Sequence, residues 1–199
     1  MHLYLEIDMK RLIIKRLAMI SLLFLIVGCG GSSRYFMLTE PEMMPHHYTK
    51  QLPLVGVEKI SLPEYMQQGS LAKQLSSTQI EYSKDAKWSE DMEESLTKQL
   101  IVAIQKSFNH PDVYAYPWDL SKQANIKIKV TISRFIAYGK NIYLDASWKI
   151  SDLRRSKERS QLFSIAVPTG STDEEIVAGM NRAFSKLSKK IVADLNRNF

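Results

Sequence analysis

Residues 126–150 alternate between apolar and polar side chains on both sides of a turn at Gly139. Successive side chains of a strand point to opposite faces of a sheet, so the pattern predicts two paired antiparallel strands. One face of this hairpin is expected to be buried and the other solvated, which requires a second layer over the buried face. The apolar positions are Ile126, Ile128, Val130, Ile132, Ile142, Leu144, Ala146, Trp148 and Ile150.

Two segments supply that second layer, because their apolar residues recur at the three- and four-residue steps of a helix. The first is predicted to begin after Ser89 as its N-cap and to end at residues 109–111. The second opens with Thr172 and Glu175, the spacing of a capping box, and runs to the C-terminus. The two apolar stripes are Met92, Leu96, Leu100, Ala103, Ile104 and Phe108, and Ile176, Met180, Phe184, Leu187, Ile191 and Leu195.

Several shorter segments complete the predicted elements. Residues 152–160 form a basic loop after the hairpin, and the remaining strands are predicted over residues 34–39, 54–62, 71–76, 78–83, 113–116 and 162–167. Together these elements predict an α+β fold, a two-layer sandwich in which a mostly antiparallel sheet carries two amphipathic helices on one face. The folded domain is expected to span residues 34–199.

The single cysteine of the chain, Cys29, follows a segment typical of a secretory signal. Basic residues precede an apolar run over residues 17–27, which is shorter than the roughly 20 residues that a membrane span needs. The run ends in Ile26, Val27 and Gly28, the small-residue approach to cysteine that bacterial lipoprotein signal peptides share. We therefore expect a signal peptide over residues 1–28, cleavage before Cys29 and a covalent lipid on its Sγ atom.

The residues around this leader predict where the protein goes. Met9 is a more natural start than Met1, because a basic pair follows it directly. Gly30 follows the cysteine, where an aspartate would retain a lipoprotein in the inner membrane of enterobacteria. Residues 29–33 are expected to be a flexible tether. The expected location is the periplasmic face of the outer membrane.

Charge and cysteine content exclude some classes of partner. The chain carries a formal charge of +6, and its leader holds four cations and two acids, so the mature domain carries about +4. The cations are spread along the chain, and nucleic acid is not a partner expected in the periplasm. Attraction of the positively charged domain to anionic membrane headgroups remains an alternative. For the basic loop, a solvated turn is favoured over a headgroup-binding site. No disulfide is expected, since Cys29 is consumed by the lipid.

No motif in the sequence predicts an enzyme. Neither a nucleophile elbow, a zinc-binding H-E-x-x-H, a P-loop nor a dinucleotide-binding glycine pattern occurs. His46 and His47 are adjacent in a loop without further ligands in reach, so we expect no metal site. The chain is therefore predicted to bind or scaffold, without catalytic residues and without a cofactor other than its lipid.

Four short motifs follow Cys29 in a fixed order. They are Tyr35-Phe36-Met37-Leu38, Leu62-Pro63-Glu64-Tyr65-Met66, Trp88-Ser89, and the hairpin positions Val130, Thr131, Phe135, Gly139 and Trp148. In this order the chain resembles the ABC-type transport auxiliary lipoproteins, and among them the PqiC (YmbA-like) subunits of Pqi intermembrane transport systems. Met66 stands where that pattern has leucine, a nearly volume-neutral change.

The resemblance implies a non-catalytic, lipid-anchored periplasmic subunit of an MCE-type lipid transport system that supports outer-membrane integrity. Its expected partner is an inner-membrane-anchored MCE-domain protein, which it would meet as a homo-oligomer. Tyr65 and Trp88 are candidate partner-binding residues, since tyrosine and tryptophan often anchor interfaces. Core packing is the alternative for both and the favoured interpretation for Trp148. A stand-alone lipid-binding carrier, with the apolar hairpin face lining a cavity, is the rival function.

Overall fold

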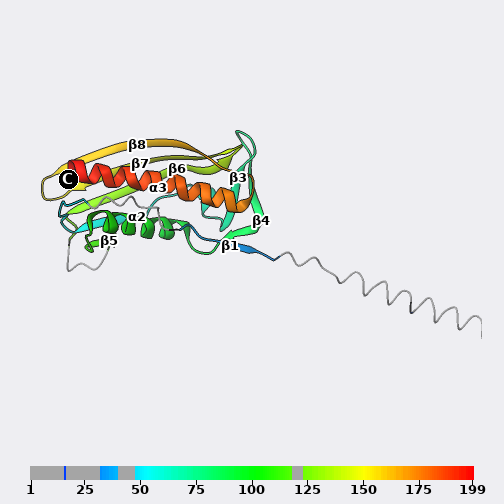
Figure 1. The fold of residues 1–199 in the computed structure, drawn as a ribbon, viewed down its shortest axis with the longest axis horizontal. Coiled ribbons are helices and arrows are strands. Elements are labelled where there is room, and N and C mark those ends of the chain that lie inside the picture. Colours follow the sequence, from blue (N-terminus) through cyan, green and yellow to red (C-terminus); the bar gives the residue numbers. More distant parts are fainter. Residues whose placement is uncertain (1–15, 17–31, 40–47, 118–122) are drawn as a thin grey trace, which may run out of the picture. The chain divides into compact units, whose positions relative to one another are not determined.

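The computed structural model describes residues 16, 32–39, 48–117 and 123–199 (Figure 1). Contacts divide the chain after residue 32, and the folded unit spans residues 33–199. The predicted cleavage box and lipidation site, residues 26–29, lie outside the described residues, as do His46 and His47. Within the described part, no helix combines the length and apolar composition that a transmembrane helix requires.

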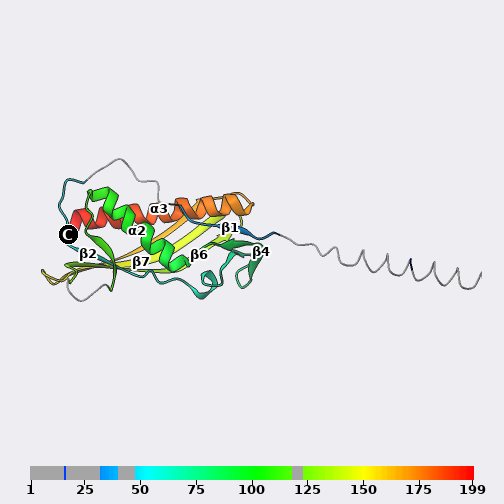
Figure 2. The ribbon, with the colours of Figure 1, turned by 90° about the horizontal axis from the view of Figure 1, so that it is seen from below.

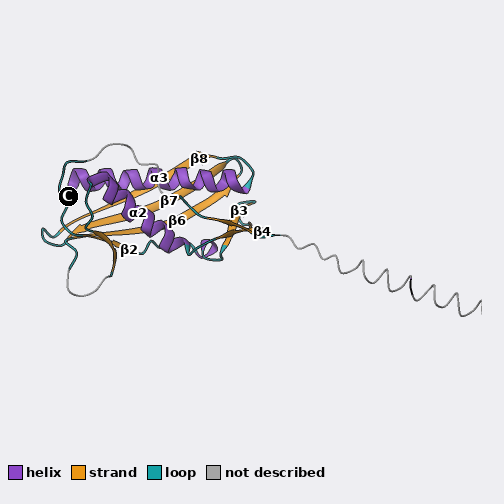
Figure 3. Cartoon of the chain, turned by 60° about the horizontal axis from the view of Figure 1, so that its bottom comes forward, coloured by secondary structure: helices purple, strands orange, loops and turns teal. Residues whose placement is uncertain are grey.

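The folded unit contains one sheet and two long helices that lie on the same face of it (Figures 2 and 3). This arrangement confirms the predicted α+β class. The elements are β1 (Arg34–Phe36), β2 (Val55–Glu58), the short 3-10 helix η1 (Glu64–Met66), β3 (Ser70–Gln74), β4 (Ile80–Trp88), α2 (Met92–Phe108), β5 (Val113–Tyr116), β6 (Ile126–Tyr138), β7 (Asn141–Asp152), β8 (Lys157–Pro168) and α3 (Asp173–Asn198).

Strand β6 organises the sheet, because it pairs with three other strands. β7 runs antiparallel to it along nearly its whole length, and β8 continues the antiparallel order beyond β7. On its other side β6 pairs in parallel with β2 at Ile126–Ile128 and with β3 at Ala137–Tyr138. β5 lies outside β2, while β4 and then β1 lie outside β3. The sheet is thus mixed, with long antiparallel ladders and short parallel ones.

The predicted hairpin is confirmed as β6 and β7. All nine of its alternating apolar residues are buried, and the polar residues between them are half-buried or exposed. Gly139 has a φ of +58°, a left-handed conformation that glycine adopts without steric cost. The pairing shifts between Ile132 and Arg134, which marks a β-bulge. Beyond this bulge Phe135, Ile136 and Ala137 are all buried.

The predicted N-cap residue is confirmed for one helix and wrong for the other. In α3 the capping box of Thr172 and Glu175 is complete. In α2 the N-cap is Asp91, not Ser89, because the Asp91 carboxylate accepts a hydrogen bond from the Glu94 amide at 2.8 Å. The Ser89 amide instead donates to the Phe36 carbonyl at 2.8 Å, which ties Ser89 to β1.

The segment predicted as a basic loop is mostly strand. Asp152 pairs with Lys157 at the turn end of the β7–β8 ladder, so only residues 153–156 form the turn. Lys157 to Ser160 are the first residues of β8, and the predicted strand over residues 162–167 is its second half. Register with β7 fixes this assignment, since each residue of β8 has a partner there.

Candidate functional site

Tyr65 lies on η1, half-buried against the core. Its hydroxyl oxygen accepts a hydrogen bond from the Phe135 amide at 2.7 Å. That amide follows the bulge in β6, where the ladder with β7 shifts by one residue. A backbone N–H that loses its ladder partner needs another acceptor, and Tyr65 supplies it. Tyr65 therefore stabilises the bulge, and partner binding through it stays a prediction.

Replacing Tyr65 with phenylalanine should destabilise the domain by about 1–3 kcal/mol, because the Phe135 N–H loses its acceptor. Burial raises the pKa of the Tyr65 phenol above its ordinary value of 10.0. A raised pKa favours the neutral phenol, so its stabilising contribution is complete below pH 10 and is lost as the pH rises through the raised pKa. Denaturant unfolding of both proteins at neutral and alkaline pH measures the difference.

Tyr35→Phe is the matched control for this prediction, since Tyr35 is 67% exposed. We expect that variant to unfold like the unmodified protein, because water can replace any partner of its hydroxyl. Equal stability of Tyr65→Phe and Tyr35→Phe would show that the contact with Phe135 contributes nothing to the fold.

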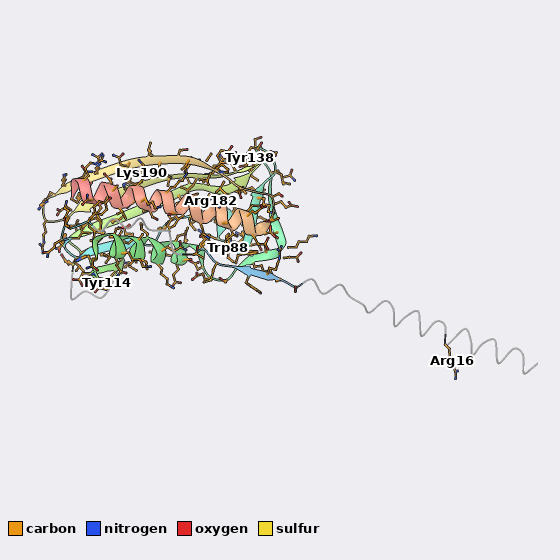
Figure 4. The ribbon with its side chains drawn as sticks, viewed as in Figure 1. Arg16, Trp88, Tyr114, Tyr138, Arg182 and Lys190 are labelled. Carbon is orange, nitrogen blue, oxygen red and sulfur yellow. The ribbon has the colours of Figure 1, made fainter. Side chains whose placement is uncertain are left out.

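Trp88 ends β4 and lies in the core, 7% exposed (Figure 4). Its backbone amide donates to the Gly69 carbonyl at 2.9 Å, which fixes the strand end beside η1. Its side chain lines a hollow of about 40 Å³ together with Met66, Gln67, Gly69 and the first residues around the start of α2. The structure thus brings Trp88 close to the segment that carries Tyr65. In the monomer the Trp88 ring is a core residue, and its part in partner binding stays a prediction.

The sheet face opposite the helices carries a larger hollow, which we call the open-face hollow. It has a volume of about 470 Å³, and most of the residues that line it are small. Leu162 forms its rim and is 87% exposed. The residues of the open-face hollow are Thr131, Ser133, Asp145, Ala146, Ser147, Leu162, Phe163 and Ser164.

Sequence reasoning predicted a solvated face here but did not find the hollow. In residues 162–167 nearly every position is apolar, so whichever way the strand faces, some apolar residues must point to solvent. The register places Phe163, Ile165 and Val167 opposite the buried residues of β7. Leu162 consequently points to the open face, opposite Ser147.

The open-face hollow can hold side chains of another molecule. Its floor offers hydroxyl groups, and the Asp145 carboxylate accepts a hydrogen bond from the Ser164 hydroxyl. Leu162 adds an exposed apolar group at the rim. Among the residues that the structure describes, no cluster of histidine, cysteine and acidic side chains is arranged to hold a metal ion.

The sequence matches one known protein family. Residues 36–192 match the model of the ABC-type transport auxiliary lipoprotein component. The chain belongs to this family. The match confirms the family resemblance that the ordered motifs indicated. Members of this family are described as auxiliary lipoprotein components of ABC-type transport. None of the curated proteins matches the sequence.

Solved structures of other proteins are similar to this chain. Protein XCC0632 from Xanthomonas campestris is similar with a TM-score of 0.69 and 16% identity, over 82% of this chain and 95% of that one. The PelC dodecamer from Paraburkholderia phytofirmans is more distant, with a TM-score of 0.41 and 11% identity over 81% of this chain and 96% of PelC. At 16% identity the likeness to XCC0632 concerns the fold alone.

Proposed function

We propose that this auxiliary lipoprotein is a non-catalytic, periplasmic subunit of an MCE-type, Pqi-like system that transports lipids between the two membranes. The observation that carries the proposal is the family match over residues 36–192, and the lipoprotein signal peptide predicted over residues 1–28 precedes the matched domain. Acyl chains on Cys29 anchor the subunit in the outer membrane. The folded domain, as a homo-oligomer, receives an inner-membrane-anchored MCE-domain protein, and this contact supports outer-membrane integrity.

The hairpin packing favours this docking role over a stand-alone lipid carrier. The carrier hypothesis depended on the apolar alternation of residues 126–150 lining a cavity. In the structure these side chains belong to one continuous core cluster with the apolar faces of α2 and α3. The same side chains therefore contact protein, and the observation that motivated a carrier is accounted for by core packing.

Docking is expected at the open-face hollow, where Leu162 is the most exposed large apolar residue among those described. An interface needs an apolar centre that water leaves on association. Replacing Leu162 with glutamate should lower recovery of the MCE-domain protein at least tenfold, because a charge would be buried in that centre. Purification of the tagged, lipidated protein from detergent-solubilised membranes, with quantitative detection of the partner, measures this recovery.

Leu153→Glu is the matched control, since Leu153 is also an exposed leucine, at 53%, but lies in the β7–β8 turn. It should leave partner recovery unchanged. If the unmodified protein recovers no MCE-domain protein, and deletion of its gene leaves envelope permeability unaltered, the proposed function is wrong. If both leucine variants recover the partner normally, docking occurs on another surface. Neighbouring genes for an MCE protein and an integral inner-membrane subunit would support the proposal.

A further inference from the structure

The outer face of α3 carries a line of cations that the proposed function does not use. Of these five cations four are exposed, and the fifth, Lys189, is half-buried. The side chains follow the helix along the face turned away from the sheet, and Arg182 and Lys190 mark the line in Figure 4. We call this set the α3 basic stripe, which consists of Arg182, Lys186, Lys189, Lys190 and Arg197.

The charge of the α3 basic stripe is not neutralised within the described residues, where none of its members forms an ion pair. The acids of α3 have other partners. Asp173 pairs with Arg34 and Lys73, and Glu174 also pairs with Arg34. Asp194 is buried and bound to neighbouring side chains of the sheet. The stripe therefore presents uncompensated positive charge.

The composition of this face favours phospholipid headgroups over a protein as the occupant. A protein interface has an apolar centre, commonly with aromatic residues. All exposed large hydrophobic side chains of the described residues lie outside α3. Lysine is a flexible point charge that does not demand a fixed acceptor geometry, which suits a fluid layer of phosphates. The stripe thus offers charge without the apolar contacts that hold a protein.

The tether holds the same helix close to a bilayer. Arg34 contacts Asp173 and Glu174 at the beginning of α3, with distances of 2.5 and 2.6 Å. Residues 29–33 can span at most roughly 17 Å, so a lipid on Cys29 keeps the Arg34 backbone within about that reach of the membrane, and the Arg34 side chain links it to the beginning of α3. From Arg182 to Arg197 the stripe is about 22 Å long at the helical rise per residue. A rotation about the tether is sufficient to lay it on the membrane surface.

Resting on the proposed lipid anchor, we propose that the α3 basic stripe binds anionic phospholipid headgroups of the membrane that holds the anchor. The helical layer then faces that membrane. The open-face hollow, on the opposite side of the sheet, points away from it and stays accessible to a partner. The charges of the stripe thereby set the orientation in which the anchored domain meets the transport system.

Vesicle co-sedimentation tests this binding without the anchor. Residues 33–199 form a compact unit with their own core, so they can be used as a soluble domain. We expect this domain to bind phosphatidylcholine vesicles only when they contain phosphatidylglycerol, and to be released as salt rises well above about 0.1 M. The double variant Lys186→Gln and Lys190→Gln should bind roughly 30-fold more weakly, at about fivefold per cation near an anionic surface.

Lys84→Gln with Lys140→Gln is the matched control, because both lysines are exposed but lie away from α3. It should bind like the unmodified domain. Equal binding to vesicles with and without phosphatidylglycerol, or equal losses in the two double variants, would overturn the proposal. So would a stripe variant that binds vesicles normally but loses the MCE-domain protein, which would assign the stripe to an acidic protein surface. Because the assay omits Cys29, it is independent of whether the proposed anchor and transport role are correct.

Discussion

Replacing Cys29 with serine is expected to leave the leader uncleaved and to remove the protein from the outer-membrane fraction. In the proposed lipidation the Cys29 Sγ atom is the nucleophile that accepts the lipid, and a serine hydroxyl is not activated at neutral pH as a thiol is. Each buried methylene contributes about 0.8 kcal/mol to membrane attachment, and a single chain holds a protein only marginally. The three chains usual for bacterial lipoproteins would make attachment effectively permanent, so losing all of them is the largest effect expected here.

Membrane fractionation and the mass of the purified N-terminus measure this outcome. The unmodified protein should begin at Cys29 and carry acyl mass, whereas Cys29→Ser should retain residues preceding position 29. Ser33→Ala, in the tether, is the control and should be processed and located normally. Recovery of Cys29→Ser in the outer-membrane fraction with a mature N-terminus would show that the polypeptide itself, and not a lipid, attaches the domain.

Local patterns predicted the elements whose burial repeats with a fixed period. The alternation over residues 126–132 of β6 and 142–150 of β7 and the apolar stripe of α3 were correct residue by residue, because each pattern extends over several turns or pleats. The capping box of Thr172 and Glu175 was also correct, since both of its hydrogen bonds form within four residues. Where the determining contacts are local, the sequence contains what is needed to predict them.

Contacts between distant segments account for what the sequence did not predict. Ser89 and Asp91 are both good N-cap residues, but the Asp91 carboxylate caps α2 while the Ser89 amide is bound to Phe36 in β1. Gly179 is a weak helix former inside α3, yet an added Cβ there would lie 2.7 Å from the Ile142 side chain. Its presence allows α3 to lie close against β7. Neither contact has a signature in the neighbouring sequence.

In the candidate site, too, features set by local patterns could be predicted and features set by distant contacts could not. Tyr65 was selected from a motif as a partner-binding residue, but its bond to Phe135 depends on a bulge that no local pattern signals. The open-face hollow depends on the register between β6, β7 and β8, which brings small residues of three strands together. The α3 basic stripe, by contrast, could have been found from its helical spacing. A search for catalytic motifs passes over it because it contains only cations.

Replacing Asp194 with alanine is expected to cause the second-largest effect, a destabilisation of about 2–3 kcal/mol. The Asp194 carboxylate is 9% exposed and accepts hydrogen bonds from three side chains. Trp148 Nε1 donates at 2.9 Å, Arg159 Nε at 2.9 Å and Asn198 Nδ2 at 2.7 Å. Truncation leaves the buried indole N–H without an acceptor, whereas Arg159 is 41% exposed at its side chain and can be rehydrated. The larger share of the loss should therefore come from Trp148.

Thermal unfolding measures this loss, which for a domain of this size lowers the Tm by roughly 4–12 °C. Asp85→Ala is the control, because Asp85 is exposed on β4 and should change the Tm little. Combining Asp194→Ala with Trp148→Phe removes the indole N–H that would otherwise lack an acceptor, while keeping an aromatic ring. The double variant should therefore lose less stability than the sum of the two single variants. Strict additivity would mean that the carboxylate and the indole do not interact, and that α3 is held on β7 by apolar packing alone.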